Sequence, residues 1–151
     1  MTARLGSGQA GARITYAHIT VDGRLLRREV EEGLEQTEWG PFQAGLFAAV
    51  AQDVDPHHQR SNGITLPDGL WVRMADAVEF EPALYPHNPV ATIVVTTLAG
   101  RSRPCFGAIV ILGAEDPETG LTSSLTPGQL AAIHTAHHLA PRCRAHEREA
   151  L

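Results

Sequence analysis

The sequence contains no lysine, and its twelve basic residues are all arginine, against 17 acidic residues. Without a lysine amine, the chain cannot form a Schiff base with a carbonyl substrate, supply a P-loop lysine or carry biotin or lipoate. Aromatic residues make up 5% of the chain. No apolar run reaches the roughly 20 residues that a membrane-spanning helix needs. We therefore expect neither amine-based covalent catalysis nor a membrane partner.

Cysteine is also scarce. Cys105 and Cys143 are too few for a disulfide framework, so we expect reduced thiols. The N-terminus has arginines but no apolar stretch of the kind found in a signal peptide. These two observations predict a cytoplasmic protein.

Charge is distributed unevenly around a net value of −5. Residues 1–28 carry five arginines, whereas residues 29–38 carry five glutamates and no basic residue: Glu29, Glu31, Glu32, Glu35 and Glu38. A surface that follows a phosphate backbone needs arginine or lysine clustered on one face. We therefore expect no nucleic-acid partner. The absence of lysine, together with abundant alanine, is typical of a GC-rich genome.

Length and composition predict one globular domain. At 151 residues, with 43% hydrophobic and 19% charged residues, the chain can bury about two thirds of its unfolded surface around a single core. We expect a flexible leader at residues 1–12, a single α+β domain at 13–140 and a C-terminal tail at 141–151.

The first half of the domain predicts a hairpin and a helix. β-Forming residues fill 13–21, the dipeptide Asp22-Gly23 suits a tight turn, and residues 24–30 supply a return strand. A helix over residues 24–36 is the alternative. Gly40-Pro41 then opens a helix over 41–54, which Asp55-Pro56 ends. Residues 57–68 are expected to form a loop.

Residues 70–81 have the clearest alternation in the chain, with apolar residues on one face of a strand and Trp71 and Arg73 on the other. Asp76 is in register with the apolar set. Either a bend at Ala75-Asp76 splits the strand, or Asp76 is a buried functional acid.

Two further strands are expected at 90–98 and 105–112, because both are apolar on both faces, as central strands are. The pattern Thr126-Pro127-Gly128-Gln129 predicts a capped helix, which Pro141 should stop near Ala140. The resulting order is β-β-α-β-β-β-α. It predicts an α+β fold with a mainly antiparallel central sheet and helices packed on it.

The last quarter holds the densest group of metal-ligand residue types. His134 and His138 lie one helical turn apart, and Cys143 and His146 could complete a site if the chain doubles back after Pro141. The alternative is surface histidines and a loose tail. His137 falls in the apolar stripe of the helix, where a packed, hydrogen-bonded core histidine is the ordinary interpretation.

Two other segments carry chemistry. Prolines stiffen residues 85–89, so Tyr85, His87 and Asn88 could form a binding lip, although a stiff connector is the plainer reading. Arg101 and Arg103 could lower the pKa of Cys105, although a cysteine at the start of an apolar strand is usually buried and inert.

Three segments, covering a little under half of the chain, resemble a GAF domain, a sensory fold that binds small molecules. They are the hairpin "ARITYAHITVDGRLLRREVEEGL", the pair "NPVATIVVTTLAGRSRPCFGAIVILG" and the closing "LTPGQLAAIHTAHHLA". The sequence lacks the family's opening helix and its N-K-x-F-D-E signature.

The resemblance implies a pocket between the sheet and the loops on one side of it, with Asp76, Tyr85, His87 and Asn88 as polar contacts. Its function would be recognition, and the domain would act as a homodimer or with a partner protein. Only Arg73 and Arg60 remain to meet an anion there, which predicts a small neutral or weakly anionic ligand. No cofactor is assigned.

Two other functions stay open. "AVEFEPAL" and the long strands are similar to a hotdog-fold acyl-thioester enzyme, whose sheet would wrap the helix at 41–54 and whose activity would depend on Asp53 or His87. A protein-interaction subunit would suit a solvent-facing Trp71 and the acidic segment at 29–38. A hotdog fold requires a sheet wrapped around one helix, which is incompatible with a sheet that lies between helices. The arrangement of the sheet therefore tests the hotdog hypothesis.

Overall fold

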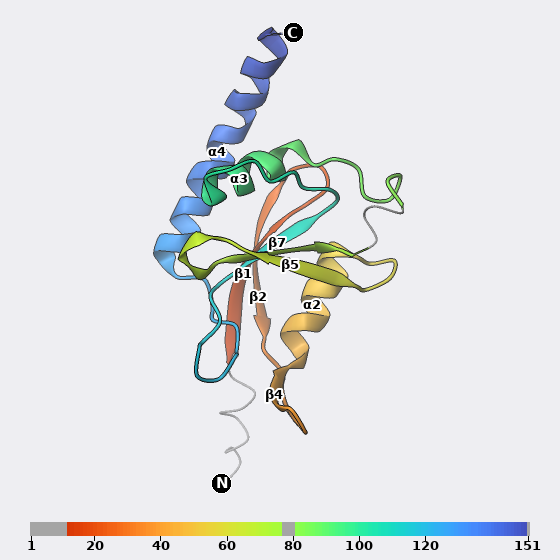
Figure 1. Cartoon of the computed structure of the whole chain (residues 1–151), viewed down its shortest axis with the longest axis vertical. Helices are drawn as coiled ribbons and strands as arrows, with labels where there is room; N and C mark the ends of the chain where they lie inside the picture. The colour runs from red at the N-terminus through yellow and green to blue at the C-terminus, as the bar shows by residue number, and fades with distance from the viewer. Residues whose placement is uncertain (1–11, 77–80, 151) are drawn as a thin grey trace.

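The core of the molecule is a five-stranded antiparallel sheet with strand order β2-β1-β7-β6-β5. This computed structural model describes residues 12–76 and 81–150, with side chains as far as Ala140. The predicted α+β fold with a mainly antiparallel sheet is confirmed (Figure 1). The expected leader lies, apart from Ala12, outside the described residues.

The predicted opening hairpin is present. Strand β1 (Arg13–Ile19) pairs antiparallel with β2 (Leu25–Glu31), and the alternative helix over residues 24–36 is wrong. Gly23, in the connecting turn, has φ +87°, a left-handed conformation that glycine adopts without steric cost. Here the sequence determined the local structure.

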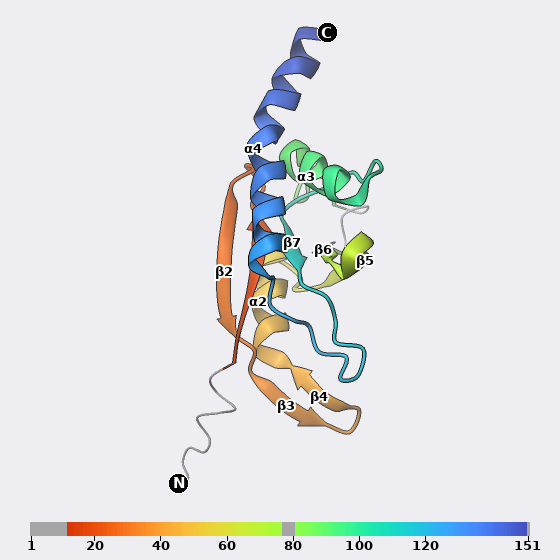
Figure 2. The same ribbon diagram turned by 90° about the vertical axis from the view of Figure 1, so that its left-hand side faces the viewer.

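Strand β7 (Ile109–Leu112) is the central strand, and all four of its residues are buried. Its side chains alternate between two apolar clusters, one on each face of the sheet. Helix α2 (Ala44–Val54) covers one face, and helices α3 (Pro89–Ala99) and α4 (Pro127–Ala150) cover the other (Figure 2). The sheet therefore lies between helices, which differs from the wrapped helix that a hotdog fold requires.

The prediction of a strand at residues 90–98 is wrong, because these residues belong to helix α3. A short run of β-branched residues does not distinguish a buried strand from a buried helix. The ends of the segment do: Asn88 accepts a hydrogen bond from the Ala91 N–H, Pro89 occupies the first turn, and Gly100 has φ +75°. One piece matched to the GAF pattern is therefore a helix here.

Two boundaries in the first half also differ from the prediction. Helix α2 begins at Ala44, because residues 40–43 form strand β4 (Gly40–Gln43), which pairs with β3 (Leu34–Thr37) in a separate two-stranded sheet. The expected loop at 57–68 contains strand β5 (Ser61–Thr65) and a 3₁₀ turn, η1 (Pro67–Gly69). Strand β5 exists through its pairing with β6, since its own sequence has little alternation.

Strand β6 (Trp71–Ala75) has the predicted faces. Val72 and Met74 pack in the cluster beneath α3 and α4, whereas Trp71 packs on the α2 side. Trp71 was predicted to face solvent, but its side chain is half-buried. Its indole N–H donates to the Gly113 carbonyl at 2.9 Å. Asp76 lies exposed in the turn after β6, so it is not a buried acid. Residues 77–80 of the predicted strand lie outside the described residues, and Glu81 is not in a strand.

Helix α4 begins as predicted. Thr126 Oγ1 accepts from the Gln129 N–H, and Gln129 Oε1 accepts from the Thr126 N–H, which together form a capping box. Pro141 does not end the helix, because the backbone stays helical to Ala150. A proline removes one hydrogen bond from a helix interior but need not terminate it. Within the described ranges, no helix is both long and apolar enough to cross a membrane.

Candidate ligand-binding site

A groove of about 530 Å³ lies on the α2 side of the sheet, beside the edge strand β5 and its neighbour β6. This volume is within the range of small-molecule sites. We call it the Arg73 groove. Its lining combines two aromatic rings, two arginines and one carboxylate with small or polar residues: Phe42, Phe47, Ala51, Gln59, Arg60, Ser61, Arg73 and Asp76.

Arg73 is held in place by three neighbours. Its guanidinium carbon lies 5.6 Å from the ring centre of Phe47 and 5.4 Å from that of Trp71, both cation–π distances. Its Nε donates to Ser61 Oγ at 2.9 Å, and its Nη2 donates to the Ser61 carbonyl at 3.0 Å. Burial lowers the pKa of Arg73 from its ordinary value, yet a guanidinium stays charged at neutral pH.

The charge of Arg73 has no carboxylate partner within 4 Å among the residues described. A guanidinium carries five N–H donors, and the bonds to Ser61 use only two of them. The groove also holds Arg60 and Asp76, and Asp76 accepts a hydrogen bond from Asn62 at 2.9 Å. Two cations and one anion give the groove a small positive excess.

The aromatic wall continues across three elements. Phe42 on β4 stacks on Phe47 of α2, with ring centres 5.8 Å apart and planes inclined by 8°. Phe47 then meets Trp71 of β6 edge-on at 6.5 Å. Such offset and edge contacts are the preferred geometries of aromatic pairs. The result is an apolar surface of fixed shape next to a fixed cation.

Asp55 is fully buried and binds the backbone of Arg60, a residue that lines the groove. It ends α2 and accepts hydrogen bonds from Tyr85 Oη at 2.6 Å and from the backbone N–H groups of His58 and Arg60 at 3.0 and 3.1 Å. Burial alone would raise the pKa of Asp55, but these hydrogen bonds outweigh it and lower the pKa. Asp55 thereby fixes the loop that carries Arg60.

The five predicted ligand contacts fall into separate groups. Arg73 and Asp76 line the groove. Tyr85 is 3% exposed, and its hydroxyl donates to Asp55, so burial and then the Asp55 carboxylate raise its pKa to about 12. Its polar atom is therefore used inside the protein.

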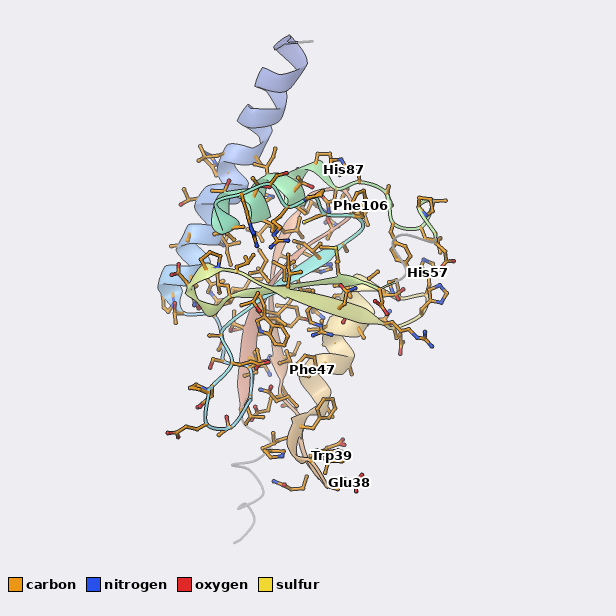
Figure 3. All side chains as sticks on the ribbon, in the orientation of Figure 1. Glu38, Trp39, Phe47, His57, His87 and Phe106 are labelled. Carbon is orange, nitrogen blue, oxygen red and sulfur yellow. The ribbon has the colours of Figure 1, made fainter. Side chains whose placement is uncertain are left out.

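His87 and Asn88 lie at the start of α3 instead. Asn88 is fully buried, and its Nδ2 donates to the carbonyl oxygens of Thr20 and Gly107, both at 2.9 Å. His87 is exposed and packs beside Phe106, with ring centres 5.6 Å apart (Figure 3). Its Nε2 lies 3.1 Å from Thr92 Oγ1. The stiff segment therefore acts mainly as a connector.

The predicted metal ligands are not brought together by the fold. His134 and His138 are exposed on α4, whose backbone continues past Pro141 instead of doubling back. With a rise of about 1.5 Å per residue, a continuous helix separates His134 from His146 by roughly 18 Å, so the four predicted residues cannot share one ion. The side chains that the structure describes contain no group of three metal-ligand residues. His137 is the hydrogen-bonded histidine expected, donating to the Gly23 carbonyl at 2.8 Å.

Asp53, the acid considered for an acyl-thioester enzyme, belongs to a charged cluster between α2 and the hairpin. Its Oδ2 accepts from Tyr16 Oη at 2.5 Å and from Arg28 Nε at 3.0 Å. His18 lies 4.0 Å away, and burial lowers the pKa of His18 despite this carboxylate. Because Asp53 is already bonded to two donors, its arrangement is that of a structural ion pair.

Cys105 is buried, and burial raises the pKa of its thiol to about 12. Burial dominates the pKa of this thiol, so Cys105 is the buried cysteine of the second interpretation and is not activated by Arg101 and Arg103. In a Cys143→Ser variant, we expect Cys105 to react with iodoacetamide at pH 8 at least about a hundredfold more slowly than free cysteine. Mass spectrometry of the alkylated protein measures this rate. Reaction at the rate of free cysteine contradicts the prediction, and urea-unfolded protein is the positive control.

Comparison with protein-family models, with curated proteins and with solved structures found no match for this chain.

Sequence reasoning identified Arg73 and Asp76, and it considered Arg60, but it missed the aromatic wall. Phe42 falls within the helix predicted at 41–54, whereas the structure places it on β4, where it lines the groove. One signal was present in the sequence: Trp71 and Arg73 are two residues apart on a strand, so both side chains lie on the same face of the sheet. The rings that join them come from elements distant in sequence.

Proposed function

We propose that this chain is a non-catalytic binding domain that holds a small, flat, weakly anionic molecule in the Arg73 groove. One observation carries the proposal: a guanidinium fixed over two aromatic rings, with N–H donors left over, lines a groove of ligand size. An aromatic carboxylate or a nucleoside monophosphate combines a flat apolar face with an anion, which fits both features.

The charges of the groove limit the ligand. Arg60 and Arg73 attract an anion, whereas Asp76 would repel a strongly charged one. A single carboxylate or phosphate monoester therefore suits the site better than a polyphosphate. The absence of lysine makes arginine the anion-binding group, and arginine can bind a carboxylate through two parallel hydrogen bonds.

A regulatory role follows from the same proposal. A ligand shifts a domain between two states only if it binds one of them more tightly. The groove is formed by α2, β4 and β6, so a bound ligand would restrain three elements together. The resemblance to GAF domains agrees with this role. The hypothesis of an acyl-thioester enzyme has less support, because the Asp53 carboxylate is hydrogen-bonded to Tyr16 and Arg28 and the sheet does not wrap a helix.

The test is a thermal-shift and calorimetry panel of benzoate, salicylate, AMP and GMP, with benzyl alcohol and benzylamine as neutral and cationic controls. An anion at a hundred times its Kd should raise the melting temperature by about 5 to 10 °C. Arg73→Met, which removes the charge but keeps much of the stem, should weaken binding at least about tenfold. Arg24→Met is the matched control, because Arg24 is an exposed arginine in the β1–β2 turn.

Two results would contradict the proposal. One is the absence of binding by every anion in the panel. The other is equal affinity in the wild type and the Arg73→Met variant, which would place the ligand elsewhere. Arg73→Lys refines the result: a site that uses stacking and bidentate contact should lose affinity in this variant despite the retained charge.

A further inference from the structure

The hairpin formed by β3 and β4 projects from the body of the protein and presents Trp39 at its tip (Figure 2 and Figure 3). Trp39 is 90% exposed, the largest value among the exposed large hydrophobic residues that the structure describes. Tryptophan carries the largest apolar surface of any side chain and is enriched in the residues that dominate binding energy at interfaces. The fold itself gains little from an indole in this position.

The turn that carries Trp39 is fixed. Thr37 Oγ1 accepts a hydrogen bond from the Trp39 N–H at 3.1 Å and donates to the Gly40 carbonyl at 2.7 Å. Gly40 has φ +107°, a conformation that favours glycine. Because the backbone of the turn is already ordered, binding through Trp39 costs less loop entropy, so more of the contact energy becomes affinity.

The base of the hairpin is also anchored. Gln43 is buried, and its Oε1 accepts from the Thr122 N–H at 2.8 Å while its Nε2 donates to the Thr122 carbonyl at 2.9 Å. An isolated two-stranded hairpin is marginal in water, so this anchor and the Phe42–Phe47 stack keep the arm in one orientation.

The charge of the arm is negative throughout. No arginine or lysine occurs from Glu29 to Gln59. Glu35 and Glu38 are exposed on the hairpin and have no cationic partner within 4 Å among the described residues. Such an arm repels nucleic acid and anionic membranes, and it attracts arginine.

Besides Trp39 and the two glutamates, the backbone edge of β3 can form hydrogen bonds with a partner. Strands β3 and β4 pair only with each other within the described residues, so the outer edge of β3 is free to accept another strand. All four β3 residues are exposed. An extended segment with alternating arginines could pair with this edge, place guanidinium groups by Glu35 and Glu38, and stack one of them on Trp39.

We propose that the β3–β4 hairpin is a docking arm for an arginine-rich extended segment of a partner protein. The docking surface, formed by Trp39, Glu35, Glu38 and the edge of β3, shares none of these groups with the Arg73 groove. Phe42 of β4 lines the groove but is not one of the proposed docking groups. The two proposals can therefore fail independently.

The test measures binding of a short fluorescein-labelled peptide of alternating arginine and valine by fluorescence anisotropy. We expect Trp39→Ala to raise Kd at least about tenfold, and the double variant Glu35→Gln/Glu38→Gln to raise it severalfold. Leu139→Ala, an exposed apolar residue on α4, is the matched control and should leave Kd unchanged. An excess of benzoate or AMP should also leave Kd unchanged, which separates this result from the ligand site.

Specificity provides the second part of the test. A lysine–valine peptide should bind more weakly, because lysine does not stack on an indole as a guanidinium does, and a glutamate–valine peptide should not bind. Bound peptide should protect Trp39 from acrylamide quenching, with the partly buried Trp71 as the internal reference.

Three outcomes would overturn the proposal. The first is equal affinity in the wild type and Trp39→Ala, and the second is equal binding of the glutamate–valine peptide. The third is a dimer of the free protein in sedimentation that Trp39→Ala converts to a monomer, because the arm would then bind a second copy of the chain.

Discussion

Replacing Asn88 by alanine is expected to lower the free energy of unfolding by about 3 kcal/mol, because the change removes a helix cap and two further side-chain hydrogen bonds, and it leaves the Gly107 carbonyl without a donor. The amide oxygen of Asn88 caps α3, and its Nδ2 bonds Thr20 and Gly107 from two other parts of the chain. The residue is fully buried, so water cannot replace its bonds to Gly107 and Ala91. Urea denaturation measures the loss.

Two further variants assign the Asn88 effect to its parts. Asn88→Asp keeps the capping oxygen but sets a second oxygen against the two carbonyls, so it should destabilise at least as much as alanine. Asn62→Ala is the exposed control and should cost under about 0.5 kcal/mol. A loss of less than about 1 kcal/mol in Asn88→Ala would show that the three hydrogen bonds do not hold these segments together.

Replacing Asp55 by asparagine is expected to lower the free energy of unfolding by about 2 kcal/mol at pH 7. The buried carboxylate accepts hydrogen bonds from Tyr85 and from two backbone N–H groups. An amide of the same size can accept only through its oxygen, so at least one donor is left facing an NH₂ group. Urea denaturation of both proteins measures the difference.

The same pair of proteins should differ in pH dependence. The pKa of Asp55 in the folded protein lies below its ordinary value of 3.8, so the unfolded chain takes up the proton first. The stability contributed by Asp55 is fully present above that ordinary value and is lost as the pH falls towards the folded pKa. The difference between wild type and Asp55→Asn should therefore shrink below about pH 4.

The control for the substitution itself is Asp68→Asn, which changes an exposed carboxylate at positive φ, where asparagine is well tolerated. Its free energy of unfolding at pH 7 should differ from that of the wild type by less than about 0.5 kcal/mol. A difference between wild type and Asp55→Asn that stays constant from pH 7 to pH 3 contradicts the assignment, because it would mean that the Asp55 pKa is the same in the folded and unfolded states.

Local sequence chemistry determined the elements whose ends carry strong signals. The β1–β2 hairpin follows from β-forming residues around Asp22-Gly23, and the start of α4 follows from the Thr126–Gln129 capping box. The two faces of β6 follow from its alternating side chains. In each case the interactions that decide the structure lie within a few residues of each other, so a single sequence contains them.

Tertiary structure decided the elements with weak or ambiguous local signals. The apolar run at 90–98 suits a strand or a helix, and its place on the sheet as α3 depends on Asn88 reaching Thr20 and Gly107. Strand β5 is held by pairing with β6 rather than by its own composition. Residues 40–43 leave the helix because β3 is available to pair with them.

The candidate site divides in the same way. The sequence by itself determined that arginine is the only side chain with a permanent positive charge at neutral pH, since there is no lysine, and it singled out Arg73 and Asp76. Only the tertiary structure decided that Arg73 lies over Phe47 and Trp71, and that Tyr85 and Asn88 bond inward. The physical reason is that residue type fixes what chemistry is available, whereas contacts between distant segments fix which groups are buried and which remain free to bind.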